Sequence, residues 1–137
     1  MIVVDTNVWS ELVRDEPEPR VRDWEAANMH RLWLSAIVLA EFRARVALMA
    51  DGRRRDRIAA LIEEVVSVYA DRHLAFDDRC TREYGPVLLS ARKAGAPIGT
   101  ADAMIAATAR AHGMRVATRN TNDFAGAGVK LIDPWTA

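Results

Sequence analysis

Short apolar runs alternate with longer segments of helical periodicity along the chain. Runs rich in Val, Ile and Leu predict buried strands, whereas apolar residues spaced three and four apart predict helices. Strands are expected at residues 2–4, 32–34, 74–76 and 115–118, with a fifth candidate at 129–132. Helices are expected at residues 8–13, 19–28, 36–50, 53–70, 78–95 and 100–113. This alternation favours an α/β fold, in which a parallel sheet of four to five strands carries helices on both faces.

The length and composition fit one globular domain. The 137 residues contain no Ser/Gly-rich linker, internal repeat or low-complexity tract, so we expect a single domain over residues 1–137. Nineteen basic and nineteen acidic residues give a formal net charge of zero, which excludes a histone-like polyanion binder and an acidic disordered tail. All the basic residues except Lys93 and Lys130 are arginines. Arginine matches the forked geometry of phosphate, although codon bias is the simpler explanation of its excess.

Cysteine and histidine exclude several kinds of site. Cys80 is the only cysteine, so neither an intrachain disulfide nor a thiolate zinc site can form, and we expect it to be a small packing residue. The three histidines are scattered without ligand spacing. The first residues do not resemble a signal peptide, and the longest apolar stretch, residues 32–40, is too short to span a bilayer. We therefore expect a cytoplasmic protein with no membrane association.

Four carboxylates lie either where ligands commonly bind or in apolar surroundings, where an unpaired charge destabilises the fold. Asp5 follows the first strand, where ligands bind in open α/β sheets, and Asp123 follows the fourth. Glu41 lies in a strongly apolar helix, and Asp102 lies in the first turn of a helix rich in small residues. Each acid also has an ordinary structural explanation. Asp5 could cap the next helix, and Glu41 could pair with Arg45 on its own helix. Asp102 could interact favourably with the dipole of a helix capped by Thr100, and Asp123 could belong to a polar turn.

Taken together, the four acids point to a metal site. Carboxylates that converge at one sheet edge repel each other and raise each other's pKa unless a cation is present. A set of oxygen ligands without His or Cys favours a hard cation such as Mg²⁺ or Mn²⁺. Ions held in this way characteristically serve phosphoryl chemistry.

Several of these motifs, in this order, are typical of one family. The motifs are Asp5-Thr6-Asn7 after an apolar strand, Ser35 with Glu41 on the next helix, Thr100-Ala101-Asp102 at a helix start, Thr118-Arg119-Asn120, Asp123-Phe124, and Leu131-Ile132-Asp133-Pro134-Trp135. With them the chain resembles the PIN-domain ribonucleases over essentially residues 1–135. More closely, it resembles the VapC toxins of bacterial type II toxin–antitoxin modules, in the FitB-like branch.

The resemblance implies a Mg²⁺- or Mn²⁺-dependent endoribonuclease that hydrolyses RNA phosphodiester bonds. Asp5, Glu41, Asp102 and Asp123 match the acidic quartet of the family, with Asp5 and Asp102 as the direct metal ligands. A polar shell that orients these carboxylates is implied at Thr6, Ser35, Thr118 and Asn120. Arg119 adjoins the site and is our candidate for an RNA phosphate contact, against the alternative of a solvated surface arginine.

The resemblance also implies partners. These are an RNA substrate, a cognate VapB/FitA-like antitoxin whose C-terminal segment covers the acidic site, a second copy of the chain in a homodimer, and operator DNA bound with the antitoxin. The arginine-rich turn at residues 52–57 is a candidate contact to RNA or the antitoxin. The four tryptophans (Trp9, Trp24, Trp33 and Trp135) are candidate contacts in the dimer or with the antitoxin. A solvated helix start and core packing are the respective alternatives.

Three other functions remain open from the residues. A receiver-type phospho-acceptor domain requires an acceptor acid at the end of the third strand, and Asp77-Asp78 stand there. A phosphatase with a nucleophilic Asp requires a second acid two residues later, where this chain has Asn7. A non-catalytic module that binds RNA or protein is the third.

In the nuclease interpretation, four of the nineteen acids gather in one pocket, which leaves fifteen acids against nineteen cations in the rest of the chain.

Overall fold

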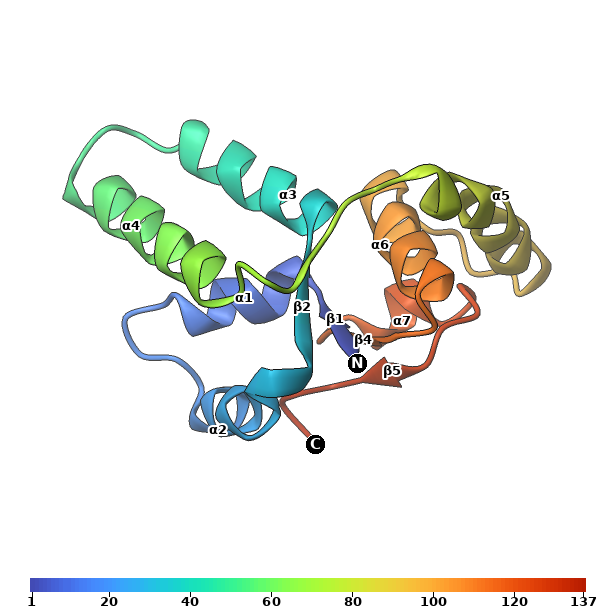
Figure 1. The fold of residues 1–137 in the computed structure, drawn as a ribbon, viewed down its shortest axis with the longest axis horizontal. Coiled ribbons are helices and arrows are strands. Elements are labelled where there is room, and N and C mark those ends of the chain that lie inside the picture. The colour runs from blue at the N-terminus through green and yellow to red at the C-terminus, as the bar shows by residue number, and fades with distance from the viewer.

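The computed structural model describes residues 1–137 and is built around one parallel sheet (Figure 1). Its strands are β1 (Ile2–Val4), β2 (Leu32–Ser35), β3 (His73–Leu74), β4 (Arg115–Ala117) and β5 (Leu131–Ile132). Their order across the sheet is β3-β2-β1-β4-β5, and every neighbouring pair is parallel. The expected α/β class with a five-stranded parallel sheet is therefore confirmed.

The strand order reverses between β1 and β4, which places a topological switch point at the centre of the sheet. From β1 the chain moves outward through β2 to β3, then returns to the other side of β1 as β4. Val3 pairs with Val116 across this junction, and the Asp5 amide donates to the Ala117 carbonyl at 2.9 Å. In open α/β sheets, ligands bind beyond the carboxyl ends of the strands at such a point.

Helices cover both faces of the sheet. They are α1 (Thr6–Leu12), α2 (Pro19–Asn28), α3 (Ala36–Ala47), α4 (Arg53–Val68), α5 (Asp78–Lys93), α6 (Thr100–Ala111) and α7 (Thr121–Phe124), with a 3₁₀ turn at Met29–Arg31. Figure 1 shows α1 to α4 on one side of the strands and α5 to α7 on the other. Right-handed crossovers explain this, because helices change faces where the chain reverses its direction across the sheet.

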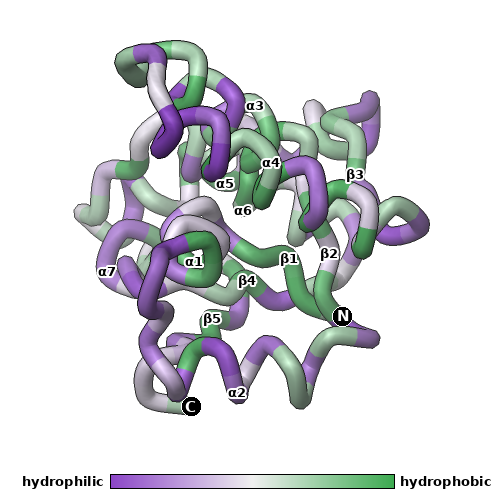
Figure 2. Tube along the Cα trace, turned by 90° about the vertical axis from the view of Figure 1, so that its left-hand side faces the viewer, coloured by the Kyte–Doolittle hydropathy of each residue, from purple (hydrophilic) through white to green (hydrophobic).

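The core lies between the central strands and these helices. Ile2, Val3 and Val4 are all buried, as a strand covered on both faces requires. The central strands accordingly form the hydrophobic centre of the tube in Figure 2, with hydrophilic segments around it. On one face, α6 buries a row of alanines, which lets its backbone approach β1 and β4 closely. On the other, Trp9 packs edge-on against Tyr69 with ring centroids 5.1 Å apart.

The structure corrects several expected boundaries. Helix α1 begins at Thr6 rather than residue 8, because Asp5 caps it by accepting the Thr6 amide hydrogen at 2.7 Å. Gly99, not Thr100, is the N-cap of α6, and Thr100 is its first residue. Helix α3 ends at Ala47 instead of residue 50, and a turn leads to Gly52, whose φ of 154° suits glycine. The loop after β4 contains α7, which replaces the polar turn expected around Asp123.

The third strand is shorter than expected and lies at the sheet edge. It covers His73–Leu74 instead of residues 74–76, because Asp77 caps α5 by accepting the Cys80 amide hydrogen at 3.2 Å. β2 separates β3 from β1, so Asp77 and Asp78 do not follow a strand that neighbours the one before Asp5. A receiver-type pocket requires those two strands side by side, and this architecture does not provide it.

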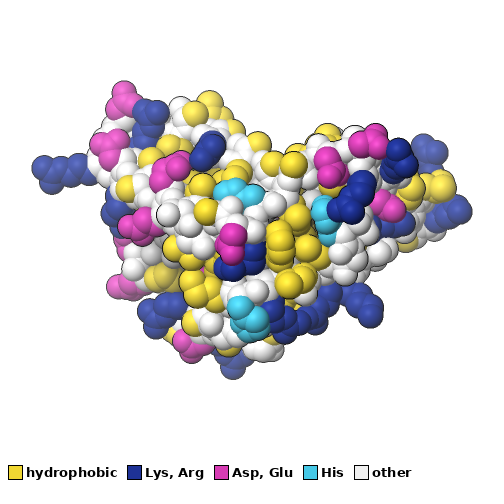
Figure 3. Space-filling model, viewed as in Figure 1, with side chains coloured by type: hydrophobic (Ala, Val, Ile, Leu, Met, Phe, Trp, Pro, Cys, Tyr) yellow, Lys and Arg dark blue, Asp and Glu magenta, His cyan; other side chains and the backbone are white.

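The surface agrees with the balanced charge. In Figure 3, Lys and Arg side chains lie scattered along the outline of the molecule instead of forming one basic face, with acids among them. Cys80 is a free, fully buried thiol, as expected of a packing residue. None of the helices combines the length and the apolar character that crossing a membrane requires.

Candidate active site

Asp5 is the buried centre of the candidate site. It follows β1 directly, and only 5% of its surface is exposed. Besides capping α1, its carboxylate accepts hydrogen bonds from the Asn7 amide at 3.0 Å and from the Thr118 hydroxyl at 2.8 Å. Burial raises the pKa of Asp5, the hydrogen bonds from Thr118 and Thr6 oppose this, and the charges of Glu41 and Asp123 add to the rise. The helix cap is therefore real, but it coexists with an electrostatic penalty that capping does not explain.

Glu41 reaches the same place from α3. Its Oε1 accepts a hydrogen bond from the Thr6 hydroxyl at 2.8 Å, which joins the first turn of α1 to the middle of α3. The expected alternative, an ion pair with Arg45, is wrong: the Arg45 guanidinium donates to the Ser10 hydroxyl at 2.5 Å. The Thr6 hydroxyl, one residue after Asp5, thus holds Glu41 toward the end of β1 instead of against a cation on its own helix.

Asp102 enters from the opposite side, in the first turn of α6. It is half-buried, and burial together with the charges of Asp5, Glu41 and Asp123, in that order, raises its pKa to about 6. A helix N-terminus favours a negative charge, so the dipole interpretation predicts a lowered pKa. Burial and the three neighbouring acids shift the pKa of Asp102 in the opposite direction.

Asp123 is the most peripheral of the four acids. It lies on α7, exposed to solvent, and its carboxylate forms no hydrogen bond or ion pair within the chain. Its charge nevertheless contributes to the raised pKa of both Asp5 and Asp102. The fold thus brings all four predicted acids within electrostatic reach of one another at the switch point.

The predicted polar shell is only partly in contact with the acids. Thr6 and Thr118 each donate to a carboxylate, whereas Ser35 is fully buried and caps α3 by accepting the Val38 amide hydrogen at 3.2 Å. The exposed side chain of Asn120 forms no hydrogen bond, although its backbone amide donates to the Thr118 hydroxyl at 3.1 Å. The structure therefore brings together two of these four side chains with the acids, and Ser35 acts on the helix that carries Glu41.

Asn7 is a positioning residue that our sequence-based site did not include. Its amide nitrogen donates to Asp5 and, at 3.1 Å, to the Thr118 hydroxyl, while its amide oxygen accepts the Arg119 backbone hydrogen at 3.1 Å. It thereby ties the loop after β4 to the end of β1. The only sequence signal for this role is that Asn7 stands two residues after Asp5. Capping residue types are common at that position, and they do not reveal a contact with Thr118, 111 residues away.

The site favours a divalent cation by its chemistry. None of the seven ion pairs in the chain involves any of the four acids, so their mutual repulsion has no internal compensation. Carboxylate oxygens are the ligands of hard cations such as Mg²⁺ and Mn²⁺. As the side chains stand, no three of them converge to hold one ion directly. Asp5 is held in position by Thr6, Asn7 and Thr118.

Comparison with known proteins gives a consistent result. The plasmid stability protein StbB of Pseudomonas syringae pv. tomato is 46% identical over 139 residues, covering 100% of both chains. The VapC ribonuclease Y4jK of Sinorhizobium fredii is 47% identical over 137 residues, covering 98% of both. The solved structure of FitAB bound to an IR36 DNA fragment contains a chain that is 39% identical, with a TM-score of 0.91, over 98% of this chain and 96% of that chain. The family model described as the PIN domain matches residues 2–130, so the chain belongs to the PIN domain family.

Proposed function

We propose that this chain is a Mg²⁺- or Mn²⁺-dependent endoribonuclease that acts as the toxin of a type II toxin–antitoxin module. The observation that carries this proposal is the uncompensated acidic cluster at the switch point. Burial and three neighbouring acids raise the pKa of Asp102 to about 6, and no cationic side chain forms an ion pair with any of the four acids. Such a cluster is costly to keep unless it holds a cation. The similarity to a protein named a VapC ribonuclease supports the choice of RNA hydrolysis among metal-dependent reactions.

Each residue of the cluster has a distinct part in this proposal. Asp5 and Asp102 would hold the ion, with Glu41 and Asp123 contributing through water or to a second ion. When bound, a divalent ion lowers the pKa of water and offsets charge at a phosphorus centre. Thr118 and Asn7 fix the Asp5 carboxylate, and Thr6 fixes Glu41. Arg119, which is exposed beside these residues, would contact a backbone phosphate of the RNA.

The partners follow from the same chemistry. An antitoxin segment that carries an arginine would neutralise the acids with a forked, charge-assisted pair and block the site. The structure of FitAB with DNA supports a complex of toxin and antitoxin on operator DNA, and we extend this expectation to a homodimer of the present chain. We also propose that residues 1–137 form a single PIN domain, which the family match over residues 2–130 supports.

The proposal is tested by metal-dependent cleavage with purified chain, free of antitoxin. We expect cleavage of single-stranded or loop RNA with Mg²⁺ or Mn²⁺ and none with EDTA. Asp5→Asn and Asp102→Asn should each reduce the rate by about 100-fold or more, because each removes charge that the ion requires. Asp23→Asn is the matched control, since Asp23 is an exposed acid on α2 without an ion pair.

Two results would contradict the proposal. One is cleavage at the wild-type rate by Asp5→Asn or Asp102→Asn, which would remove the acidic cluster from the reaction. The other is RNA binding without metal-dependent cleavage of any RNA tested, which would favour the non-catalytic binding module.

A further inference from the structure

Arg119 and Trp135 form a stacked pair at the edge of the candidate site. The Arg119 guanidinium lies over the Trp135 ring, 5.0 Å from its centroid. The two residues come from the loops after β4 and β5, which are neighbouring strands, so both emerge at the carboxyl edge of the sheet. The pair therefore combines a cation and a partly exposed aromatic ring at this edge.

The chain around Trp135 holds it in place. The Trp135 amide donates to the Asp133 carboxylate at 2.9 Å, and the amides of Thr136 and Ala137 donate to the Asp133 carbonyl. Its ring is half-buried and packs against the edge of the core. These hydrogen bonds and this packing fix the position of the Trp135 ring.

Hydrogen bonds connect the pair to Asp5. The Arg119 amide donates to the Asn7 side chain, and Asn7 in turn donates to Asp5. The position of the stacked pair relative to the catalytic acid is therefore fixed by a single intervening side chain. A substrate group that stacks here would be held next to the phosphate at the reacting centre.

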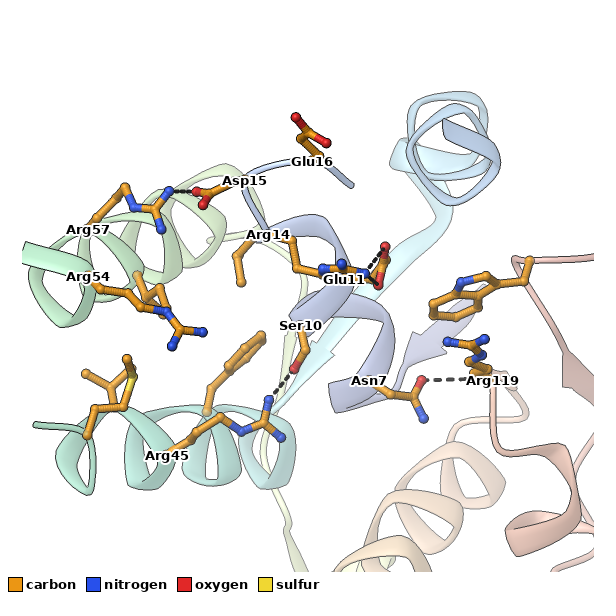
Figure 4. Close-up of a pocket in the computed structure, with 16 residues that line it drawn as sticks. Asn7, Ser10, Glu11, Arg14, Asp15, Glu16, Arg45, Arg54, Arg57 and Arg119 are labelled. Atoms are coloured by element: carbon orange, nitrogen blue, oxygen red, sulfur yellow. Dashed lines mark hydrogen bonds and ion pairs between the residues drawn. The ribbon is translucent and has the colours of Figure 1, made fainter. Parts of the chain in front are cut away.

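A groove of about 870 Å³ extends from this pair along α1, α3 and α4 (Figure 4). Arg14, which lines it, is paired with Glu11, and Arg57 is paired with Asp15. Arg45 contacts only the neutral Ser10 hydroxyl, and Arg54 has neither an ion pair nor a side-chain hydrogen bond. Figure 4 shows Arg119 and Asn7 at one end, Arg45 between, and Arg54 near the far end. Three arginines that form no ion pair thus lie along the groove, although the charge of Arg119 also acts on Glu11.

We propose that the Arg119–Trp135 pair stacks a base of single-stranded RNA beside the cleaved phosphate, while Arg45 and Arg54 contact the backbone of the nucleotides that follow. This inference rests on the proposed ribonuclease function and adds a base-recognition site to it. Single-stranded RNA is the occupant that fits, because its unstacked bases bind to aromatic and guanidinium planes and its phosphates bind to unpaired arginines. An acidic peptide would satisfy the arginines but leave the stacking surface unused.

The test measures RNA binding and cleavage separately. Binding is measured by fluorescence anisotropy in the Asp102→Asn chain, with labelled single-stranded RNAs about ten nucleotides long. Trp135→Leu should weaken binding about tenfold, whereas Trp135→Phe should retain most of the affinity because it keeps an aromatic face. RNA should also quench the indole emission, and Trp135→Phe should lose most of this quenching. In the active chain, Trp135→Leu should raise KM and flatten the base preference next to the cut.

Matched variants control for structural effects. Trp33 lies on β2, outside the groove, and its indole donates to the Met1 sulfur. Trp33→Leu should therefore leave RNA affinity unchanged. Arg45→Ala/Arg54→Ala should weaken binding about tenfold, and Arg92→Ala/Lys93→Ala, with the same charge loss at the exposed end of α5, should have little effect.

The outcomes separate this inference from the proposed function. If wild-type chain cleaves RNA and Trp135→Leu binds and cleaves as wild type does, the stacking site is wrong and the nuclease stands. If the wild-type chain cleaves nothing but RNA binding depends on Trp135, the stacking site stands and the nuclease fails. Groove variants that weaken only the complex with the antitoxin, with RNA affinity unchanged, would assign the groove to a protein and overturn the inference.

Discussion

At the scale of single residues, Asp102 shows how the acidic site lowers the stability of the metal-free fold. Its pKa is raised from the ordinary value near 3.8 to about 6, first by burial and then by Asp5, Glu41 and Asp123. An acid whose folded-state pKa exceeds its unfolded value binds protons more tightly in the folded state. Its contribution to stability is therefore fully present below about pH 4 and is lost as the pH rises through about 6. In the metal-free protein at neutral pH, a charged Asp102 destabilises the fold.

Asp102→Asn should therefore stabilise the metal-free protein while abolishing cleavage. We expect a gain of about 1 kcal/mol in the free energy of unfolding at pH 7.5, a modest value because Asp102 is half-exposed and its neighbours are screened by solvent. The gain should disappear below about pH 4, where the wild-type carboxyl is already neutral. Urea unfolding in EDTA at several pH values measures this difference, with Asp23→Asn as control. A loss of stability at neutral pH would show that Asp102 is compensated within the chain.

At the scale of elements, periodicity predicted where helices and strands lie, whereas contacts between distant loops were not readable. The predicted positions of β1 and α2 are confirmed, because local chemistry decides them. The apolar run at residues 74–76 predicts a strand there, but β3 covers only His73–Leu74. The run alone does not show that Asp77 caps the next helix and that the strand must end before it. Asn7 was missed because its role depends on strand order, which brings the loop after β4 beside α1.

The cap of α3 matters to the site because that helix carries Glu41. Ser35→Ala removes a fully buried oxygen and leaves the Val38 amide without its partner, so we expect a loss of about 1–2 kcal/mol in the free energy of unfolding. Fraying of the first turn would also loosen Glu41, so the cleavage rate should fall even where the protein remains folded. Chemical denaturation and cleavage assays at low temperature measure the two effects.

Ser67→Ala is the matched control, because Ser67 is exposed near the end of α4 and its hydroxyl forms no hydrogen bond within the chain. Its free energy of unfolding should change by no more than about 0.5 kcal/mol. Equal effects of the two substitutions would mean that the Ser35 hydroxyl contributes nothing as a cap.

At the scale of the whole molecule, a net charge of zero is compatible with an RNA enzyme because the charges are segregated. Four acids lie together at the switch point, and most other acids near the groove are paired with arginines. Burial opposes ionisation of Glu11, for example, but the Glu18 amide, Arg14 and Arg119 outweigh it and lower the pKa of this acid. Few arginines in the groove are therefore free to bind a polyanion. This distinguishes the surface from one with a broad basic face.

This distribution predicts a weak dependence of RNA affinity on salt. Each phosphate neutralised on a single strand contributes about −0.7 to the slope of log K against log salt concentration, so contacts from Arg45, Arg54 and Arg119 give a slope of about −2. Anisotropy titrations of the Asp102→Asn chain over a series of salt concentrations measure it, and Arg45→Ala/Arg54→Ala should reduce it to about −0.7. A wild-type slope several times steeper would require a basic surface that the charge balance does not supply. A slope near zero would leave the three unpaired arginines without a phosphate contact, and binding would then rest on stacking alone.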